Sequence, residues 1–294
     1  MQTQAVQAAR TKSRLKSILL EAVCILLFIL FMLPFAIVLL NSMRSNSEIM
    51  QSAVGLPTNI GQFFTNVKAM LSNATFSYFS SFKDSTIITV FSLAAISLVS
   101  SMAAWVLVRN KSRVSKGIFL MFIAAMCIPF QVVMFPLISW FKSLGNVTGL
   151  PMLRSHFGMV FAYVGFGESL SIFIFHGFIK NIPVALEEAA DIDGCSRPGI
   201  FFRIVLPLLQ PVFVTVLVLN GLWIWNDYLL PLLLLGSNGG VQTIPLAVQI
   251  FLGTYVRQWD LAMTSTLLAM LPIIILYLFA QKYIIRGMVE GAVK

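Results

Sequence analysis

The sequence predicts an all-α, polytopic membrane protein with six transmembrane helices, and three observations carry this prediction. Hydrophobic residues make up 58% of the 294 residues and charged residues only 11%, whereas soluble domains carry about 25% charged residues. The mean hydropathy of +0.89 exceeds what one buried core could hide, so lipid must cover much of the apolar surface. Six apolar runs are each long enough to cross about 30 Å of hydrocarbon.

The first apolar run, 18–40, follows a cationic segment, 1–17. It exceeds the roughly 7 to 15 apolar residues of a secretory signal and lacks a small-residue cleavage site, so we expect it to remain as a span. A polar stretch at about 41–85 separates it from the other runs. The remaining predicted spans are 86–108, 117–140, 159–179, 212–235 and 261–281.

The distribution of Lys and Arg predicts which side of the membrane each loop faces, because cationic loops stay on the cytoplasmic side. With the N-terminus inside, 14 of the 20 Lys and Arg fall in cytoplasmic segments and 6 in outer ones. Both termini are therefore predicted to be cytoplasmic. The net charge of +9 follows from the same loops and gives no reason to expect a nucleic-acid partner.

Catalytic and metal sites have few candidate residues in this sequence. The three cysteines and two histidines show neither paired-Cys spacing nor an HExxH pattern, and no acid, base and nucleophile cluster together. We therefore predict no catalytic residue, no metal ligand and no cofactor. The sequence also lacks GxxxxGK[ST], so the chain has no P-loop of its own for ATP.

The polar segment between the fourth and fifth runs, at about 180–207, holds the most informative pattern. Pro183 favours the start of a short helix there, and Gly194 marks a firm stop. Glu187 and Glu188 fall in the N-terminal half of this helix, where the helix dipole favours acidic side chains. After the glycine, a second helix can begin and continue into the fifth run.

This segment resembles the cytoplasmic signature of the permease subunits of bacterial binding-protein-dependent ABC importers. That signature is Glu-Ala-Ala, three residues, Gly, nine residues, Ile, one residue and Leu-Pro. The two alanines would also leave one helix face thin enough for another protein's backbone to approach. Every fixed position is met at its expected spacing, by Glu188, Ala189, Ala190, Gly194, Ile204, Leu206 and Pro207.

Two further segments look like the carbohydrate branch of that family, the maltose-permease-like second subunit. They are Trp225-Asn226-Asp227-Tyr228 and the C-terminal stretch 281–287 with 291–294. The resemblance extends from roughly the second apolar run to the end of the chain. It implies that 18–294 fold as a type I ABC importer transmembrane domain.

The resemblance also implies partners. The import pathway would combine two such permeases, two cytoplasmic ATPases and an extracytoplasmic sugar-binding protein, which the outer stretches 41–85 and 236–260 could contact. The short loop helix would be the coupling helix, with Glu188 paired to an ATPase cation, and a rigid loop could pass ATPase closure to the spans. The residues implied in ATPase coupling are Glu187, Glu188, Ala189, Ala190, Asp191, Gly194, Ile204, Leu206 and Pro207.

The expected function is therefore the permease subunit of an ATP-driven carbohydrate importer. A di- or oligosaccharide is the expected solute, and a glycerol phosphodiester or another polyol is the alternative. An ion-coupled transporter would ask for internal symmetry and a chain of membrane carboxylates. Only Glu168 and Asp227 favour that class.

Polar groups within the predicted spans are the candidates for a solute pathway. Glu168, near the middle of the fourth run, either lines a hydrated path or pairs with a buried group. Trp225 and Tyr228, three residues apart, could offer a flat face to a sugar ring or belong to an interfacial aromatic belt. Glu21 and His176 are interpreted as structural. The candidate pathway residues are Glu168, Asn220, Trp225, Asn226, Asp227 and Tyr228.

Overall fold

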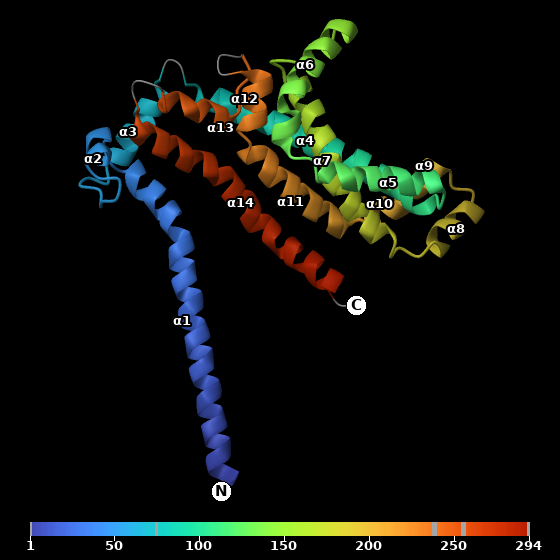
Figure 1. Cartoon of the computed structure of the whole chain (residues 1–294), viewed down its shortest axis with the longest axis horizontal. Helices are drawn as coiled ribbons and strands as arrows, with labels where there is room; N and C mark the ends of the chain where they lie inside the picture. The colour runs from blue at the N-terminus through green and yellow to red at the C-terminus, as the bar shows by residue number, and fades with distance from the viewer. Residues whose placement is uncertain (1, 74–75, 237–239, 254–256, 293–294) are drawn as a thin grey trace. The chain divides into compact units, whose positions relative to one another are not determined.

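The computed structural model describes the backbone of 2–73, 76–236, 240–253 and 257–292, and within these it leaves out the side chains of 2–15, 276, 279–280 and 282–292. Over the described residues the protein is helical, apart from one isolated bridge between Leu252 and Arg257. The predicted all-α class is confirmed (Figure 1). The helices are α1 Gln2–Ser42, α2 Asn46–Gln51, α3 Gln62–Leu71, α4 Tyr78–Arg109, α5 Arg113–Met126, α6 Phe130–Thr148, α7 His156–Ile179, α8 Ala185–Ile192, α9 Arg197–Ile200, α10 Leu206–Leu208, α11 Gln210–Asn226, α12 Leu229–Leu235, α13 Ile244–Val248 and α14 Trp259–Ala292, with a π-helical turn at Phe201–Val205 and a 3-10 turn at Gln249–Phe251.

The chain forms two compact units, one made of 1–72 with 251–267 and the other of 73–250 with 268–294. In the first unit, α1 runs without a break from Gln2, so its backbone shows no boundary after residue 17. Its apolar side chains from Ile18 to Phe35 are exposed, as expected of a helix that meets lipid or another protein rather than its own core.

A polar network surrounds the end of α1 in the first unit. The buried Arg44 donates to Asn41 Oδ1 (2.8 Å) and to the carbonyl oxygens of Ser52 (2.9 Å) and Glu48 (2.7 Å). Glu48 in turn completes a capping box with Ser45 at the start of α2. Such reciprocal bonds satisfy the free amide groups that every helix start leaves.

The second unit is built around α4 and α7, which pack along one another, with α5 against α7 and α11 against both. A Cβ at Gly167 of α7 would lie 2.6 Å from Ile96 Cδ1 and 2.9 Å from Asn220 Oδ1. Glycine at this position therefore lets α7 approach α4 and α11 closely. Small residues at such contacts are typical of helix packing in membranes.

Two predicted spans are not single straight helices, which corrects the sequence-based expectation. The run at 117–140 is broken between α5 and α6, which are bent by 106°. Pro129 lacks an amide hydrogen and disfavours helical backbone in the residue before it, which accounts for a break there. The run at 212–235 is divided where α11 ends, because Asp227 has extended backbone (φ −72°, ψ 129°).

Among the described residues, three helices are long and apolar enough to cross a membrane, or up to five if each bent pair makes one span. The three are the part of α1 from Lys16 to Ser42, α4 and α7. The apolar part of α14, Trp259–Ile275, is shorter. The count of six spans and the side of each terminus stay predictions.

Candidate functional site

The loop between α7 and α11 contains the short helix α8, close to the position that the sequence predicts. α8 ends at Ile192, with Asp193 as its C-cap, and Gly194 follows with a left-handed φ of +82°, which glycine adopts without strain. Ser196 then caps α9, because its hydroxyl accepts a bond from the Gly199 amide. The glycine stop and the second helix are therefore confirmed.

Glu187 of α8 faces inward and ties the loop to the end of α4. Its side chain is only 6% exposed. Arg109 donates to Glu187 Oε1 through Nε (2.8 Å) and Nη2 (2.7 Å), and Trp105 Nε1 donates to Glu187 Oε2 (2.9 Å). Arg109 Nη2 also donates to the carbonyl oxygen of Ile182 (3.0 Å). This bracket, formed by Arg109, Trp105 and Glu187, fixes both the position and the rotation of α8.

Most other positions of α8 are exposed. Glu188, Ala189 and Asp191 all lie on the surface, whereas Ala190 is buried beneath them. Ile192 at the end of the helix is 87% exposed. The surface therefore combines acidic groups, an alanine and an apolar side chain, and no residue that the structure describes covers them. This combination suits contact with another protein.

The second half of the signature, the Ile-x-Leu-Pro residues, lies where the loop joins the helix bundle. Ile204 and Leu206 pack against a buried cluster that includes Phe201 and Val205, while Pro207 is exposed. The chain bends by 76° between the segment ending at Leu208 and α11. Ile204 and Leu206 thus join α8 and α9 to the helix bundle, whereas Pro207 lies on the surface.

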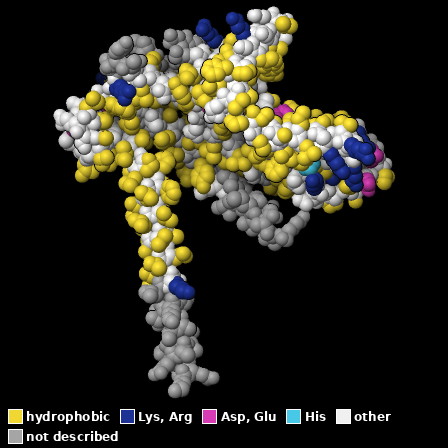
Figure 2. Space-filling view, in the orientation of Figure 1, with side chains coloured by type: hydrophobic (Ala, Val, Ile, Leu, Met, Phe, Trp, Pro, Cys, Tyr) yellow, Lys and Arg dark blue, Asp and Glu magenta, His cyan; other side chains and the backbone are white. Residues whose placement is uncertain are grey.

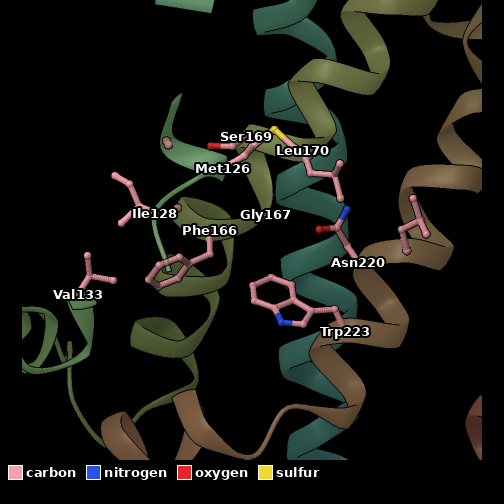
Figure 3. Close-up of a pocket in the computed structure, with 12 residues that line it drawn as sticks. Met126, Ile128, Val133, Phe166, Gly167, Ser169, Leu170, Asn220 and Trp223 are labelled. Carbon is pink, nitrogen blue, oxygen red and sulfur yellow. The ribbon is translucent and has the colours of Figure 1, made fainter. Parts of the chain in front are cut away.

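A cavity of about 440 Å³ lies between α7, α11 and the bend that joins α5 to α6. Figure 3 shows Phe166 of α7 and Trp223 of α11 facing the same space, with Asn220 on the next turn of α11. Trp223 is 41% exposed, whereas Asn220 is buried and donates to Ser171 Oγ (3.0 Å). The cavity therefore offers aromatic walls and a few neutral polar groups, a composition that suits an uncharged polar solute.

The structure brings only Asn220 of the predicted pathway residues to this cavity. Trp225 is 8% exposed, donates from Nε1 to the Ala269 carbonyl oxygen (3.1 Å) and contacts Phe82 edge to face. Because α11 ends at Asn226, Tyr228 lies outside the helix. The expected shared face of Trp225 and Tyr228 is therefore wrong.

Asp227 and Asn226 have local structural partners. Asp227 Oδ2 accepts a bond from the Tyr163 hydroxyl (3.1 Å), and Oδ1 accepts one from the Leu229 amide (3.0 Å) at the start of α12. Asn226 is exposed and donates to the Leu222 carbonyl oxygen (2.8 Å). Asp227 thus acts as a helix cap at the break in the predicted fifth span.

Glu168 lies near the middle of α7, as predicted, and is partly buried. It does not line the cavity, although Gly167 and Ser169 on either side of it do. Among the described residues no hydrogen bond or ion pair of Glu168 is found. The structure therefore supports neither of the two roles that the sequence left open.

Comparison with known proteins identifies the family. The family of binding-protein-dependent transport system inner membrane components matches residues 95–290. The chain belongs to this family. The matched region contains α5 to α13, and with them α8, its bracket and the cavity. A member of this family with several apolar helices is a multi-pass inner membrane protein.

Individual relatives match over nearly the whole chain. The probable starch degradation products transport system permease protein AmyC of Thermoanaerobacterium thermosulfurigenes is 41% identical, over 96% of this chain and 99% of its own. The melibiose/raffinose/stachyose import permease protein MelC of Bacillus subtilis is 34% identical, over 98% and 100%. A solved bacterial ABC transporter for the acidic polysaccharide alginate has a similar fold, with a TM-score of 0.74 at 20% identity, over 92% of this chain and 96% of that one.

Sequence reasoning missed two residues that position the family's loop in this chain, Arg109 and Trp105. The sequence places Arg109 among the cations of the predicted cytoplasmic segments. Nothing in the local sequence links it to Glu187, which lies 78 residues later. A pairing of this kind depends on how α4 and the loop meet in space. The missed cavity residue Trp223 had a weak signal, because it lies three residues from Asn220 on one helix face.

Proposed function

We propose that this chain is the permease subunit of an ATP-driven carbohydrate importer. In this proposal it forms one half of the translocation pathway, performs no chemistry of its own, and couples to a cytoplasmic ATPase through α8. The observation that carries the coupling part is the orientation of α8, with Glu187 held inward by Arg109 and Glu188 exposed. A helix held in this way can transmit a push from a partner to α4 as a rigid body.

The proposed solute is a di- or oligosaccharide. Names of the relatives support this, since AmyC and MelC are described as permeases for starch degradation products and for melibiose, raffinose and stachyose. The neutral polar and aromatic lining of the cavity at Asn220 and Trp223 suits sugar hydroxyls and ring faces. A glycerol phosphodiester or another polyol is the alternative solute, and the uncharged lining disfavours only the anionic phosphodiester.

The proposed assembly places this chain with a second, homologous permease, two cytoplasmic ABC ATPases and an extracytoplasmic sugar-binding protein in the cytoplasmic membrane. The family is binding-protein-dependent by its description, and the sequence has no P-loop for ATP. Both termini and the 180–207 loop face the cytoplasm in this arrangement, because most Lys and Arg lie on that side.

The sharpest test of coupling reverses the charge of Glu188. The tagged chain is purified in mild detergent from native membranes, and its companions are identified by mass spectrometry. We expect a P-loop ATPase and a second permease with the wild type. With Glu188→Lys we expect a large loss of ATPase recovery and of ATP-driven sugar uptake, because the carboxylate that faces the partner becomes a cation.

A matched control separates coupling from folding in that test. Lys142→Glu reverses an exposed charge on α6, outside the loop, and should leave ATPase recovery and uptake as in the wild type. Recovery of the ATPase and normal uptake with Glu188→Lys would contradict the coupling proposal. Recovery of the wild-type chain alone, active in liposomes without ATP, would instead favour an ion-coupled transporter.

A further inference from the structure

A second cavity, of about 550 Å³, lies where α4 and α7 end and α5 begins. It is distinct from the cavity at Asn220, since the two share no lining residue. One wall continues through Lys180 and Val184 into the segment that leads to α8. The hollow therefore lies at the ends of two apolar helices and beside the loop proposed to couple to the ATPase.

The rim of this cavity is cationic. Lys111, Lys116 and Lys180 line it and are exposed, and the described residues place no carboxylate within 4.0 Å of any of them. Arg109 also lines it, but its charge is engaged by Glu187. Figure 2 shows Lys and Arg side chains gathered at the end of the helix group where α5, α8 and α9 lie in Figure 1. Three lysines thus line one cavity, and the described residues form no ion pair with any of them.

The remaining walls are apolar or aromatic. The Phe119 ring stacks on His176 with 3.6 Å between ring centroids, and Lys180 Nζ lies 6.0 Å above the Phe119 ring. Leu107 and Leu120 complete the apolar side. The first turn of α5 also borders the hollow at Ser115 and Lys116 and contains no acidic residue, so its positive dipole end adds to the attraction for an anion.

We propose that this cavity binds a phosphate-bearing anion, in the first place the headgroup of an acidic glycerophospholipid. The lysine ammonium groups supply the positive charge and the hydrogen-bond donors that a phosphodiester needs. The apolar walls suit the glycerol and the first carbons of the acyl chains. Basic pockets between membrane helices on the cytoplasmic side are physically suited to such headgroups. A soluble phosphate ester shares the same chemistry and is the other source.

Occupancy of the cavity has a consequence for α8. A phosphate held by Lys111 and Lys116 on one side and Lys180 on the other would join the start of α5 to the segment leading into α8. It would add to the bracket that Arg109 and Glu187 already form. This consequence rests on the proposed coupling function, whereas the binding of the anion does not.

The test compares lipid retention by the importer complex in nanodiscs with and without phosphatidylglycerol in phosphatidylcholine. The variant Lys111→Gln/Lys116→Gln/Lys180→Gln removes the cationic rim. Each lysine near an anionic lipid contributes roughly fivefold in affinity, so we expect a loss of about 100-fold. The control is Arg197→Gln/Arg203→Gln, which removes exposed cations of the same loop that do not line the cavity and should leave retention unchanged.

Native mass spectrometry of the complex measures retained phosphatidylglycerol without any need for transport, so this test can fail while the proposed function stands. Loss of the lipid in the lysine variant but not in the control supports the proposal. Equal retention in both variants overturns it. In phosphatidylcholine alone, retention of added glycerol 3-phosphate by the wild type, lost in the lysine variant, assigns the site to a soluble phosphate ester.

Discussion

Arg109 and Glu187 show at the scale of single residues how adjacent glutamates can have different roles. Both Glu187 and Glu188 lie in the first turn of α8, yet one is buried against Arg109 and the other is exposed. Consecutive helix positions are about 100° apart, so they cannot share a face. Glu187 therefore sets where α8 lies, and Glu188 stays on the surface.

Removing the cation of the bracket should loosen α8. Arg109→Leu leaves a buried carboxylate without its strongest donor, at a cost of about 1.5–3 kcal/mol for hydrogen bonds to a charged group. We expect ATP hydrolysis to continue with less sugar imported per ATP, measured in proteoliposomes of the whole importer. The double variant Arg109→Leu/Glu187→Leu should recover part of the wild-type amount of sugar imported per ATP, because it leaves no unpaired charge of this bracket buried. An unchanged ratio in the single variant would remove the bracket from coupling.

Glu48 gives a pH-dependent prediction outside the membrane spans. Hydrogen bonds from the Thr58 hydroxyl, and then from the Ser45 amide and hydroxyl, lower the pKa of Glu48 from 4.5 to about 2. Because the folded-state pKa is depressed, the ionised carboxylate stabilises the fold above pH about 4.5, and this contribution is lost as the pH falls towards 2.

We therefore expect Glu48→Gln to lower the Tm in detergent at neutral pH. The difference from the wild type should narrow as the pH is taken below about 4.5, where the wild-type carboxylate begins to lose its advantage. Thermal unfolding followed by tryptophan fluorescence across this pH range measures both Tm values. A gap that widens at acid pH would contradict the assigned bonds.

At the scale of elements, α8 depends on the glycine that ends it. Gly194 has a φ of +82°, and a Cβ there would meet nothing within 4 Å, so the cost of a side chain is backbone strain alone, about 1–2 kcal/mol. Gly194→Val should make the loop more accessible to limited proteolysis. Gly177→Ala on α7 is the matched control, because it also has open space but ordinary helical backbone, and it should leave proteolysis unchanged. Equal cleavage of both variants would count against the left-handed stop.

The breaks in two predicted spans show that the hydropathy of a segment does not reveal where a helix within it ends. Residues 117–140 and 212–235 are continuous in hydropathy, and the apolar pattern alone favours one helix in each. Pro129 and Asp227 interrupt them because their backbones are extended. The first break forms the bend beside the cavity. The second gives α12 its capped start at Asp227.

At the scale of the whole molecule, the arrangement of loops about the membrane yields a labelling prediction. After replacement of the three cysteines by serine, single cysteines are introduced as Asp193→Cys after α8 and Val147→Cys at the end of α6, both at exposed positions. With the 180–207 loop inside, a membrane-impermeant maleimide should label position 147 but not 193 in spheroplasts. Inside-out vesicles stripped of ATPase should give the opposite result. Labelling of position 193 in spheroplasts would overturn the predicted topology.

The sequence by itself determined the class of protein, the helical fold and the position of the short loop helix α8 with its glycine stop. Hydropathy indicates directly which segments can lie in lipid, because a membrane-spanning helix must be apolar whichever other helices pack against it. Gly194 and the Glu-Ala-Ala signature are likewise local, because spacing along the chain fixes them. These features need no knowledge of which helices meet.

Only the tertiary structure decided which polar residues are exposed, line a cavity or lie in the core. Glu187 is held by a residue 78 positions earlier, Trp225 is buried against Ala269 of α14, and the cavity at Asn220 combines residues of four helices. Each outcome depends on contacts between segments far apart in the chain. The free energy of these contacts comes from burial and from pairing of polar groups in three dimensions. The order of residues along the chain does not show which groups will be paired in this way.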